Sequence, residues 1–424
     1  MGLHSAATRA RQMTNIPINA DRLWASLMEM AKIGATKKGG NCRLALTDVD
    51  KEGRDLFVRW CKDADCDVTI DAVGNIFARR PGTDPSKAPV MMGSHLDTQP
   101  TGGRFDGVLG VLAGLEAIRT LNDHAVETEA PVEVVCWTNE EGSRFAPAMM
   151  GSGVFTGVFE LDEIRVKTDL DGLAFGDELE RIGYAGAETP GSHEVGSYFE
   201  LHIEQGPILE AEDRTIGVVT AAQGQRWYEI TVTGQESHAG PTPMPVRRDA
   251  LLAASKIVQE VNRIGHHHPP HACATVGQML VSPNSRNVIP GSVFLTVDFR
   301  HPVDETLSNM DRTLKAFSAT LAKENQVRID IVDFWYFPPT PFSDGCIEAV
   351  REGAKAAGLG YMDIVSGAGH DAVYIAGVAP TGMIFVPCED GISHNEIENA
   401  TPEDCAAGCQ VLLHAILARA EALD

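Results

Sequence analysis

The segment GSHLDTQPTGGRFDG, residues 93–107, carries three side chains that can bind a metal ion, His95, Asp97 and Asp106. It follows the apolar run 88–92, which is typical of a buried strand. Imidazole and carboxylate groups are common ligands of divalent cations such as zinc. One such residue means little by itself, but three of them at the end of a predicted strand indicate a candidate metal site.

An acidic pair, Glu140 and Glu141, follows a second apolar run, 132–138. Adjacent side chains at a strand end point in different directions, so one carboxylate could bind a metal while the other acts as a general base toward water. Because the carboxyl ends of parallel strands meet at one edge of a sheet, we expect this pair near His95. Taken alone, NEEG is more typical of a solvated loop, and SHLD of a surface loop or helix cap.

Two further histidines complete a ligand set. His202 lies in the strand-like run FELHIEQGP, and His394 lies in the polar loop EDGISHNE before the last helix. Either one alone is more typical of a structural histidine. The full set of candidate metal ligands is His95, Asp106, Glu141, His202 and His394. Three imidazoles and two carboxylates suit borderline divalent metals, and one carboxylate can bridge two ions. Asp97 could accept the second ring N–H of His95 and fix its tautomer.

The predicted elements describe how these residues are positioned. Helical periodicity covers 23–33, 46–64 and 108–121, whereas 70–79, 90–93 and 132–138 are strand-like. This alternation predicts an α/β fold with a mostly parallel sheet flanked by helices. From about residue 224, alternating strands and two long helices predict an α+β unit. We therefore expect a discontinuous catalytic domain of residues 1–222 and 337–424, and an inserted lid or dimerisation domain of residues 223–336.

Composition narrows the possible functions. The formal net charge of -24 opposes binding to nucleic acid or to an anionic membrane. No apolar segment approaches the roughly 20 residues that cross a bilayer, and the N-terminus lacks the apolar core of a signal peptide, so a cytoplasmic location is expected. The nine cysteines include no C-x-x-C pair, which leaves histidines and carboxylates as the metal ligands.

A series of motifs resembles a known family. The motifs GSHLDT, GGRFDGVLGV, TNEEGSRF, HIEQGPILE, SHAGPTPM, SPNSRNVIPG, VDFR, SGAGHDA and SHNE occur in this order. They resemble the amidase (hydantoinase/carbamoylase) branch of the metallopeptidase M20 superfamily, and within it the N-carbamoyl-L-amino-acid hydrolases and β-ureidopropionases. The resemblance implies hydrolysis of N-carbamoyl-L-amino acids, or of N-carbamoyl-β-alanine, to the amino acid, carbon dioxide and ammonia. It also implies two divalent metal ions per subunit, zinc first, with manganese, cobalt or nickel as alternatives.

The same resemblance assigns roles to the candidate residues. It implies Asp106 as a bridge, His95 and His202 at one metal, and Glu141 and His394 at the other. Glu140 would be the general base, in agreement with its position after a predicted strand. Peptidases of the superfamily usually have a carboxylate where this chain has His202, so this residue favours the amidase branch.

Substrate recognition is implied for two other groups of residues. The resemblance assigns Arg300 and Asn287 to a substrate carboxylate, Gln205, Gly369 and His370 to the carbamoyl end, and His238 of a neighbouring subunit to oxyanion stabilisation. The strand pattern places Arg300 opposite an apolar face, where it could bind a carboxylate or simply pair with Asp298. Asn287 could equally be a turn residue, and His238 a loop residue. A homodimer formed through the inserted domain, which closes over the substrate, is also implied.

Arg226 leaves two classes of substrate possible. It stands in GQRW at the start of the inserted domain, which is similar to the allantoate amidohydrolases of the same branch, where a cationic residue helps to bind a larger ureido substrate. A structural ion pair at the domain hinge explains Arg226 equally well. Allantoate, or another N-acyl or ureido acid, is therefore the alternative substrate. A metal-free binding protein is disfavoured because no ligand position is missing, and a serine hydrolase because no G-x-S-x-G elbow occurs.

Overall fold

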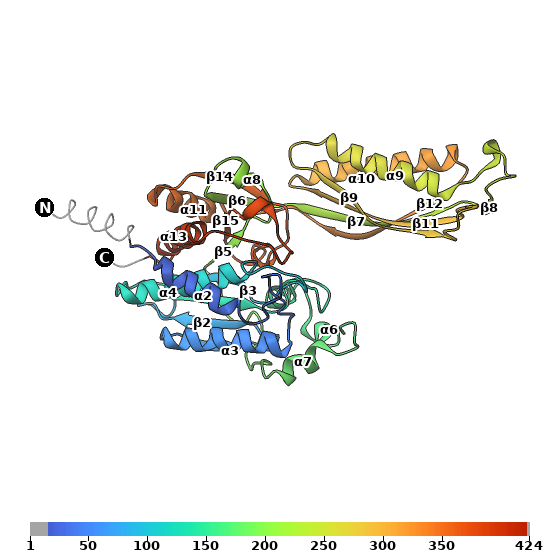
Figure 1. The fold of residues 1–424 in the computed structure, drawn as a ribbon. Helices are drawn as coiled ribbons and strands as arrows, with labels where there is room; N and C mark the ends of the chain where they lie inside the picture. Colours follow the sequence, from blue (N-terminus) through green and yellow to red (C-terminus); the bar gives the residue numbers. More distant parts are fainter. Residues whose placement is uncertain (1–15, 422–424) are drawn as a thin grey trace. The chain divides into compact units, whose positions relative to one another are not determined.

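The computed structural model describes residues 16–421, which form two compact units (Figure 1). The first unit extends to Thr220 and resumes at Phe342, and the second is the insertion Ala221–Pro341. The sequence predicted this insertion at residues 223–336. No helix among residues 16–421 is long and apolar enough to span a membrane.

The first unit is built on a nine-stranded sheet. Its strands in spatial order are β1 (Asp67–Ile70), β2 (Ile76–Arg80), β4 (Val132–Trp137), β3 (Val90–His95), β5 (Ser197–Ile203), β15 (Thr381–Val386), β6 (Ile216–Ala222) and β13 (Thr340–Pro341), and β14 (Tyr361–Ser366) also pairs with β6. The central strands β4, β3, β5 and β15 are parallel. Antiparallel pairs flank them on both sides. The predicted α/β class, with a large sheet flanked by helices, is confirmed, and its parallel part is the centre.

Helices α3 (Asp48–Asp63), α4 (Val108–Asp123), α11 (Asp344–Ala356), α12 (Asp371–Ile375) and α13 (Pro402–Arg419) pack against this sheet. The other helices of the unit are α2 (Ala20–Met30), α5 (Met150–Phe155), α6 (Leu161–Arg165), α7 (Phe175–Arg181) and α8 (Ile208–Ala211). Every residue of the four central strands is buried, which requires cover on both faces. Helix α4 packs against β3, β4 and β5, and almost all of its residues are buried. This burial explains the continuous apolar run that predicted α4.

One predicted strand is two strands. The sequence pattern indicated a single strand over 70–79, which is wrong, because β1 and β2 form an antiparallel hairpin there. The Asp71 carboxylate accepts hydrogen bonds from the backbone N–H groups of Val73 and Asn75, and Gly74 adopts a φ of 89°. A short polar side chain that caps its own turn reverses the chain within an otherwise strand-like run.

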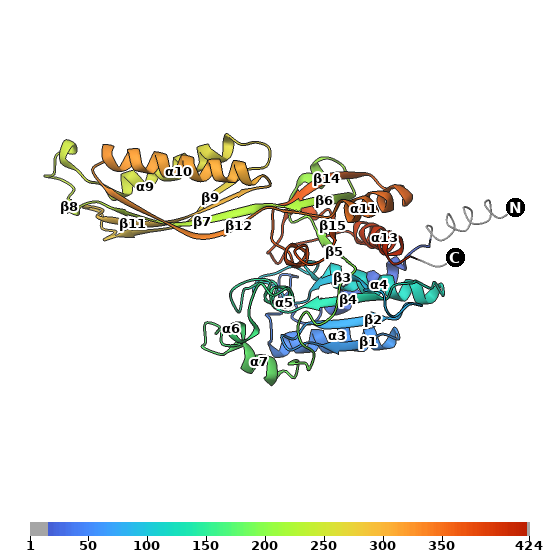
Figure 2. The same cartoon turned by 180° about the vertical axis from the view of Figure 1, so that it is seen from behind.

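The second unit is an antiparallel sheet covered by two helices on one face (Figure 2). Its strands, in the order β12 (Arg328–Phe337), β7 (Gly224–Thr233), β11 (Ser292–His301) and β9 (Cys273–Ser282), lie under α9 (Ala250–His266) and α10 (Asp304–Glu324). Along β11, buried and partly exposed residues alternate, so one face forms the core with the helices. The short strands β8 (Ser237–His238) and β10 (Val288–Ile289) pair separately.

Candidate metal centre

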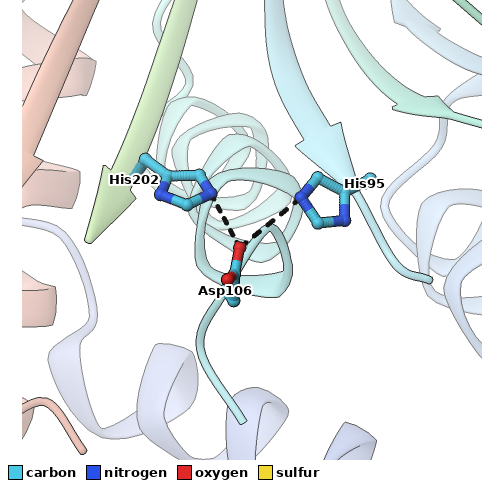
Figure 3. Close-up of side chains that lie close together, drawn as sticks. All are labelled: His95, Asp106 and His202. Atoms are coloured by element: carbon cyan, nitrogen blue, oxygen red, sulfur yellow. Dashed lines mark ion pairs between the residues drawn. The ribbon is translucent and has the colours of Figure 1, made fainter. Parts of the chain in front are cut away.

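Two neighbouring strands bring the first ligand group together. His95 is the last residue of β3, rather than lying beyond its end as the sequence suggested, and His202 is the penultimate residue of β5. Both imidazoles point toward Asp106, which precedes α4 (Figure 3). Asp106 Oδ1 lies 3.6 Å from His95 Nε2 and 3.1 Å from His202 Nε2. All three residues are buried, and one ligand atom of each lies within 4.8 Å of the others, so together they could hold one metal ion.

The second ligand group uses the other oxygen of the same carboxylate. His394 Nε2 lies 3.4 Å from Asp106 Oδ2 and 3.4 Å from Glu141 Oε2. The side chain of His394 is 53% exposed, whereas that of Glu141 is 4% exposed. The two oxygens of Asp106 thus face two separate groups of donors, which is the arrangement that a bridging carboxylate requires.

A glycine allows Asp106 to approach the histidines. Gly107 has a φ of 68°, and a Cβ atom on it would lie 2.3 Å from His95 Cε1. Its backbone N–H donates to His202 Nε2 at 3.2 Å. Any larger residue at this position would therefore meet both a strained backbone and the His95 ring.

Backbone carbonyl groups orient the two buried imidazoles. His95 Nδ1 lies 2.8 Å from the backbone oxygen of Asp97, and His202 Nδ1 lies 2.9 Å from the carbonyl oxygen of the next residue. Asp97 therefore contacts the second ring nitrogen of His95, as the sequence suggested, but through its backbone oxygen and not through its carboxylate. That carboxylate instead accepts the backbone N–H groups of Glu140 and Glu141, each at 3.2 Å, because the Asp97 side chain points toward the loop after β4. Asp97 thus joins the loops that follow β3 and β4.

The acidic pair diverges as expected of adjacent residues. Glu141 faces His394, whereas Glu140 is buried and places its Oε2 atom 3.4 Å from His95 Nε2. Burial, followed by the nearby charge of Asp371, raises the pKa of Glu140 well above its usual value. Glu140 is therefore a carboxylate that could exchange a proton beside the ligand groups.

The electrostatics of the site favour a bound cation. Burial, followed by the charge of Asp106, raises the pKa of Glu141 well above its usual value. Burial alone would also raise the pKa of Asp106. Its hydrogen bond to His202 and the nearby imidazoles instead hold this pKa well below its usual value. Burial would lower the pKa of His202, but its contact with Asp106 raises it to about 9. The donor set fits divalent cations, which supply positive charge in the same place.

Three predicted substrate residues of the first unit lie at this centre. Gln205 donates from Nε2 to Asp106 Oδ2 at 2.8 Å, and its buried Oε1 atom has no hydrogen-bond partner among residues 16–421. The ring of His370 lies 4.6 Å from that of His202, and Gly369 precedes it in the loop before α12. Burial, followed by the positive charge of His202, holds the pKa of His370 well below its usual value, so its imidazole is neutral.

The second unit does not bring its predicted residues together. Arg300 forms an ion pair with Asp298, with Nη2 2.9 Å from Oδ2, and pairs with Gln225 at the start of β7. His238 and Asn287 lie side by side beyond the other end of β7, where the Ala239 N–H donates to the Asn287 carbonyl oxygen. At the usual rise per residue, these positions are roughly 25 Å from Arg300.

Arg226 lies on the opposite face of the sheet from Arg300. Its guanidinium carbon lies 4.2 Å from the centre of the Tyr336 ring, and Nη2 donates to Ser308 Oγ of α10 at 3.3 Å. No ion pair of Arg226 occurs among residues 16–421, so the predicted hinge ion pair is wrong, because stacking on an aromatic ring takes its place. The structure therefore does not place Arg226 and Arg300 on one ligand.

Sequence reasoning missed three residues that support the ligands. Gln99 donates from its backbone N–H and from Nε2 to the two oxygens of Glu141, and Ser393 Oγ donates to Asp106 Oδ2. Glu398 accepts the backbone N–H of Asp106. Each lies within five residues of a predicted ligand or of Asp97, which is the only signal that the sequence offered.

Comparison with known proteins identifies the class of the chain. The sequence pattern of peptidase family M20/M25/M40 matches residues 91–418. The chain therefore belongs to this family, and the resemblance inferred from its motifs is confirmed. It is an M20-type amidohydrolase.

Particular relatives narrow this class. An N-carbamoyl-L-amino-acid amidohydrolase of Rhizobium meliloti is 52% identical over 410 residues, covering 97% of this chain and 99% of the relative. A solved amidase of the hydantoinase/carbamoylase family from Burkholderia multivorans is 64% identical, with a TM-score of 0.93, and the match covers 96% and 98% of the two chains. An allantoate amidohydrolase of Escherichia coli is 35% identical, covering 90% and 94%.

Proposed function

We propose that this chain hydrolyses N-carbamoyl-L-amino acids to the amino acid, carbon dioxide and ammonia. The observation that carries the proposal is the arrangement around Asp106, whose two oxygens each face a separate group of metal-competent donors. The identity of 52% to an amidohydrolase with this activity supports the substrate class.

Two divalent metal ions per chain would occupy this centre. Asp106 would bridge them, His95 and His202 would complete one site, and Glu141 and His394 the other. Zinc suits a set of imidazoles and carboxylates, and manganese, cobalt and nickel accept the same donors. When bound, such ions supply Lewis-acid polarisation of the scissile carbonyl group and lower the pKa of water.

Glu140 would act as the general base and then as the general acid. Its Oε2 atom lies beside the first ligand group, and the pKa of Glu140, which burial and Asp371 raise, makes its carboxylate a stronger proton acceptor. In the reaction, Glu140 would accept a proton from the attacking water and return it to the leaving nitrogen. The Asp97 carboxylate would keep Glu140 in place by accepting a hydrogen bond from the backbone N–H of Glu140.

The carbamoyl end of the substrate would lie against residues of the first unit. The buried Oε1 atom of Gln205 can accept an N–H group of the ureido substrate, which supports its assignment. Gly369 and His370 would complete this end. One ring nitrogen of His370 lies 2.9 Å from Ser366 Oγ, which limits the ring to a single orientation.

Residues of the second unit would bind the carboxylate and the oxyanion. Arg300 and Asn287 would contact the substrate carboxylate, and His238 would stabilise the developing negative charge. The separation of roughly 25 Å between Arg300 and the other two residues favours two copies of the chain as their source. We therefore propose a homodimer formed through the inserted unit. The cytoplasmic location stays a prediction.

Allantoate is the second candidate substrate, because an allantoate amidohydrolase is 35% identical over most of this chain. The test is the kcat/KM of purified enzyme for N-carbamoyl-L-methionine, N-carbamoyl-β-alanine and allantoate, before and after metal removal by a chelator. The proposal expects the carbamoyl amino acid to be the best substrate, and it expects activity to disappear without metal and to return with zinc, manganese, cobalt or nickel. Full activity after verified metal removal would contradict it, and preference for allantoate would favour the alternative.

A further inference from the structure

One buried carboxylate holds the turn that carries Asp106. Glu398 Oε1 accepts the backbone N–H groups of Phe105 and Asp106, at 3.0 and 3.1 Å. Glu398 lies 292 residues further along the chain and is 1% exposed. Two buried N–H groups of one turn therefore depend on a single side chain from the loop before α13.

The second oxygen of the same carboxylate holds the loop of another ligand. Glu398 Oε2 lies 3.2 Å from Ser393 Oγ, and this hydroxyl lies 3.0 Å from Asp106 Oδ2. Ser393 directly precedes His394. Glu398 thus contacts both the backbone of the Asp106 turn and the residue beside His394, which belongs to the second ligand group.

Gly103 leaves the space that Glu398 occupies. A Cβ atom on Gly103 would lie 2.0 Å from both Cδ and Oε1 of Glu398. The φ of Gly103 is not in the left-handed region, so the backbone conformation alone does not require glycine there. The glycine pair before Asp106 therefore has a specific partner, and a methyl group on Gly103 would displace it.

Fold stability alone explains Glu398 poorly. Among residues 16–421 it forms no ion pair, and it lies close to a second buried carboxylate, Asp106. A buried charge without a cation is costly, and well-packed apolar residues usually stabilise such a position better. Its hydrogen bonds go instead to the two segments that carry Asp106 and His394.

We propose that Glu398 is a positioning residue, which locks the Asp106 turn to the His394 loop so that both oxygens of Asp106 face their ligand groups at once. Its effect comes from the reach of its side chain and not from its charge. This inference rests on the proposed metal function. It predicts that the geometry of the two ligand groups depends on Glu398 although Glu398 itself binds no ion.

Variants can distinguish the effect of the side-chain length of Glu398 from the effect of its charge. Glu398→Gln keeps the length and an acceptor oxygen, so it should bind Zn²⁺ within about threefold of wild type. Glu398→Asp keeps the charge but is one methylene shorter, so it should lose roughly 10- to 100-fold in affinity, as supporting residues of metal sites typically do. Gly103→Ala retains Glu398 but displaces it and should reproduce the loss. Glu396→Gln, in the same loop and paired with Lys38, is the matched control.

The measurements are titration of chelator-treated, full-length protein with Zn²⁺ by calorimetry, and the visible absorption spectrum of the Co²⁺-loaded protein. The spectra of Glu398→Asp and Gly103→Ala should differ from those of wild type and Glu398→Gln. Urea unfolding of the metal-free proteins shows whether each variant is folded.

The outcomes separate the two claims. If wild type and Glu396→Gln bind no metal, the proposed function fails. If they bind metal and a folded Glu398→Asp or Gly103→Ala binds it equally tightly, the inference about Glu398 fails. Loss of affinity in Glu398→Gln also overturns it, because charge would then be required, and this variant carries the test if the other two do not fold.

Discussion

The two units of this chain place their predicted functional residues in opposite ways. In the first unit, the five candidate ligands come from segments between His95 and His394, yet their donor atoms gather around one carboxylate. In the second unit, Arg300 lies at one end of the four-stranded sheet, whereas His238 and Asn287 lie beyond its other end, at the separate β8–β10 pair. The first unit thus brings its candidate ligands together within a single chain, whereas the second unit by itself keeps its predicted recognition residues apart.

The largest effect is expected when the proposed base is removed from the first unit. Glu140→Gln keeps the size of the side chain but cannot accept the proton, so kcat should fall by roughly 10²- to 10⁴-fold. Steady-state kinetics with N-carbamoyl-L-methionine and metal analysis of the same sample check this expectation. Since Glu140 is not among the proposed ligands, metal content should not change. A variant with wild-type kcat would exclude Glu140 as the base.

Removing His238 tests the oxyanion role assigned to the second unit. His238→Ala should lower kcat by about 10²- to 10³-fold, which is the usual loss for one oxyanion donor. Glutamine at the same position, which keeps a donor, is the comparison variant. Unchanged kcat in His238→Ala would place this exposed residue outside the reaction.

Hybrid dimers test whether His238 acts at the site of its own chain or at the site of the partner chain. A dimer of one Glu140→Gln chain and one His238→Ala chain has one site with an intact base and an intact His238 only if the histidine comes from the partner. Tandem-tag purification should then give about half of the wild-type activity per dimer. If His238 acts within its own chain, the hybrid has no complete site and stays at the level of the single variants.

Arg300 should affect binding rather than chemistry. Arg300→Lys keeps the charge but loses the planar fork, and KM should rise roughly 10- to 100-fold with little change in kcat. Arg328→Lys, on the exposed edge strand of the same sheet and paired with Asp330, is the control. An unchanged KM in Arg300→Lys would exclude Arg300 from substrate binding.

The smallest effect is expected at Arg226. Because its guanidinium stacks on Tyr336 on the helix-covered face, Arg226→Gln should change kcat/KM by less than about threefold and lower the free energy of unfolding by about 1 kcal/mol. Urea unfolding and kinetics with both allantoate and a carbamoyl amino acid check this. A large rise of KM for allantoate alone would instead support the allantoate alternative.

The sequence predicted those features that depend on local periodicity. Helix α4 was expected over 108–121 and extends from Val108 to Asp123, since its apolar residues are buried all round. The ligands could be grouped because His95 and Glu141 lie at or just after the ends of neighbouring parallel strands. The β1–β2 turn was missed because a side-chain cap at Asp71 overrode the strand pattern.

Other features depend on where distant segments meet. The direction of the Asp97 carboxylate depends on the loop after β4, and the partner of Gly103 lies in a loop almost 300 residues away. The distance between Arg300 and His238 follows from the register of β7 with β11, which periodicity alone does not specify. Spacing could therefore suggest which residues belong to a site, but not which of their atoms face each other.

The two oxygens of Asp106 predict two metal sites that this carboxylate joins within one chain. Titration of the metal-free protein with Zn²⁺ measures this most directly, with Asp106→Asn as the matched variant, because an amide keeps the shape but offers only one donor oxygen. We expect two ions per chain in the wild type and no more than one in Asp106→Asn. A single ion in the wild type, or two in the variant, would show that Asp106 does not join two metal sites.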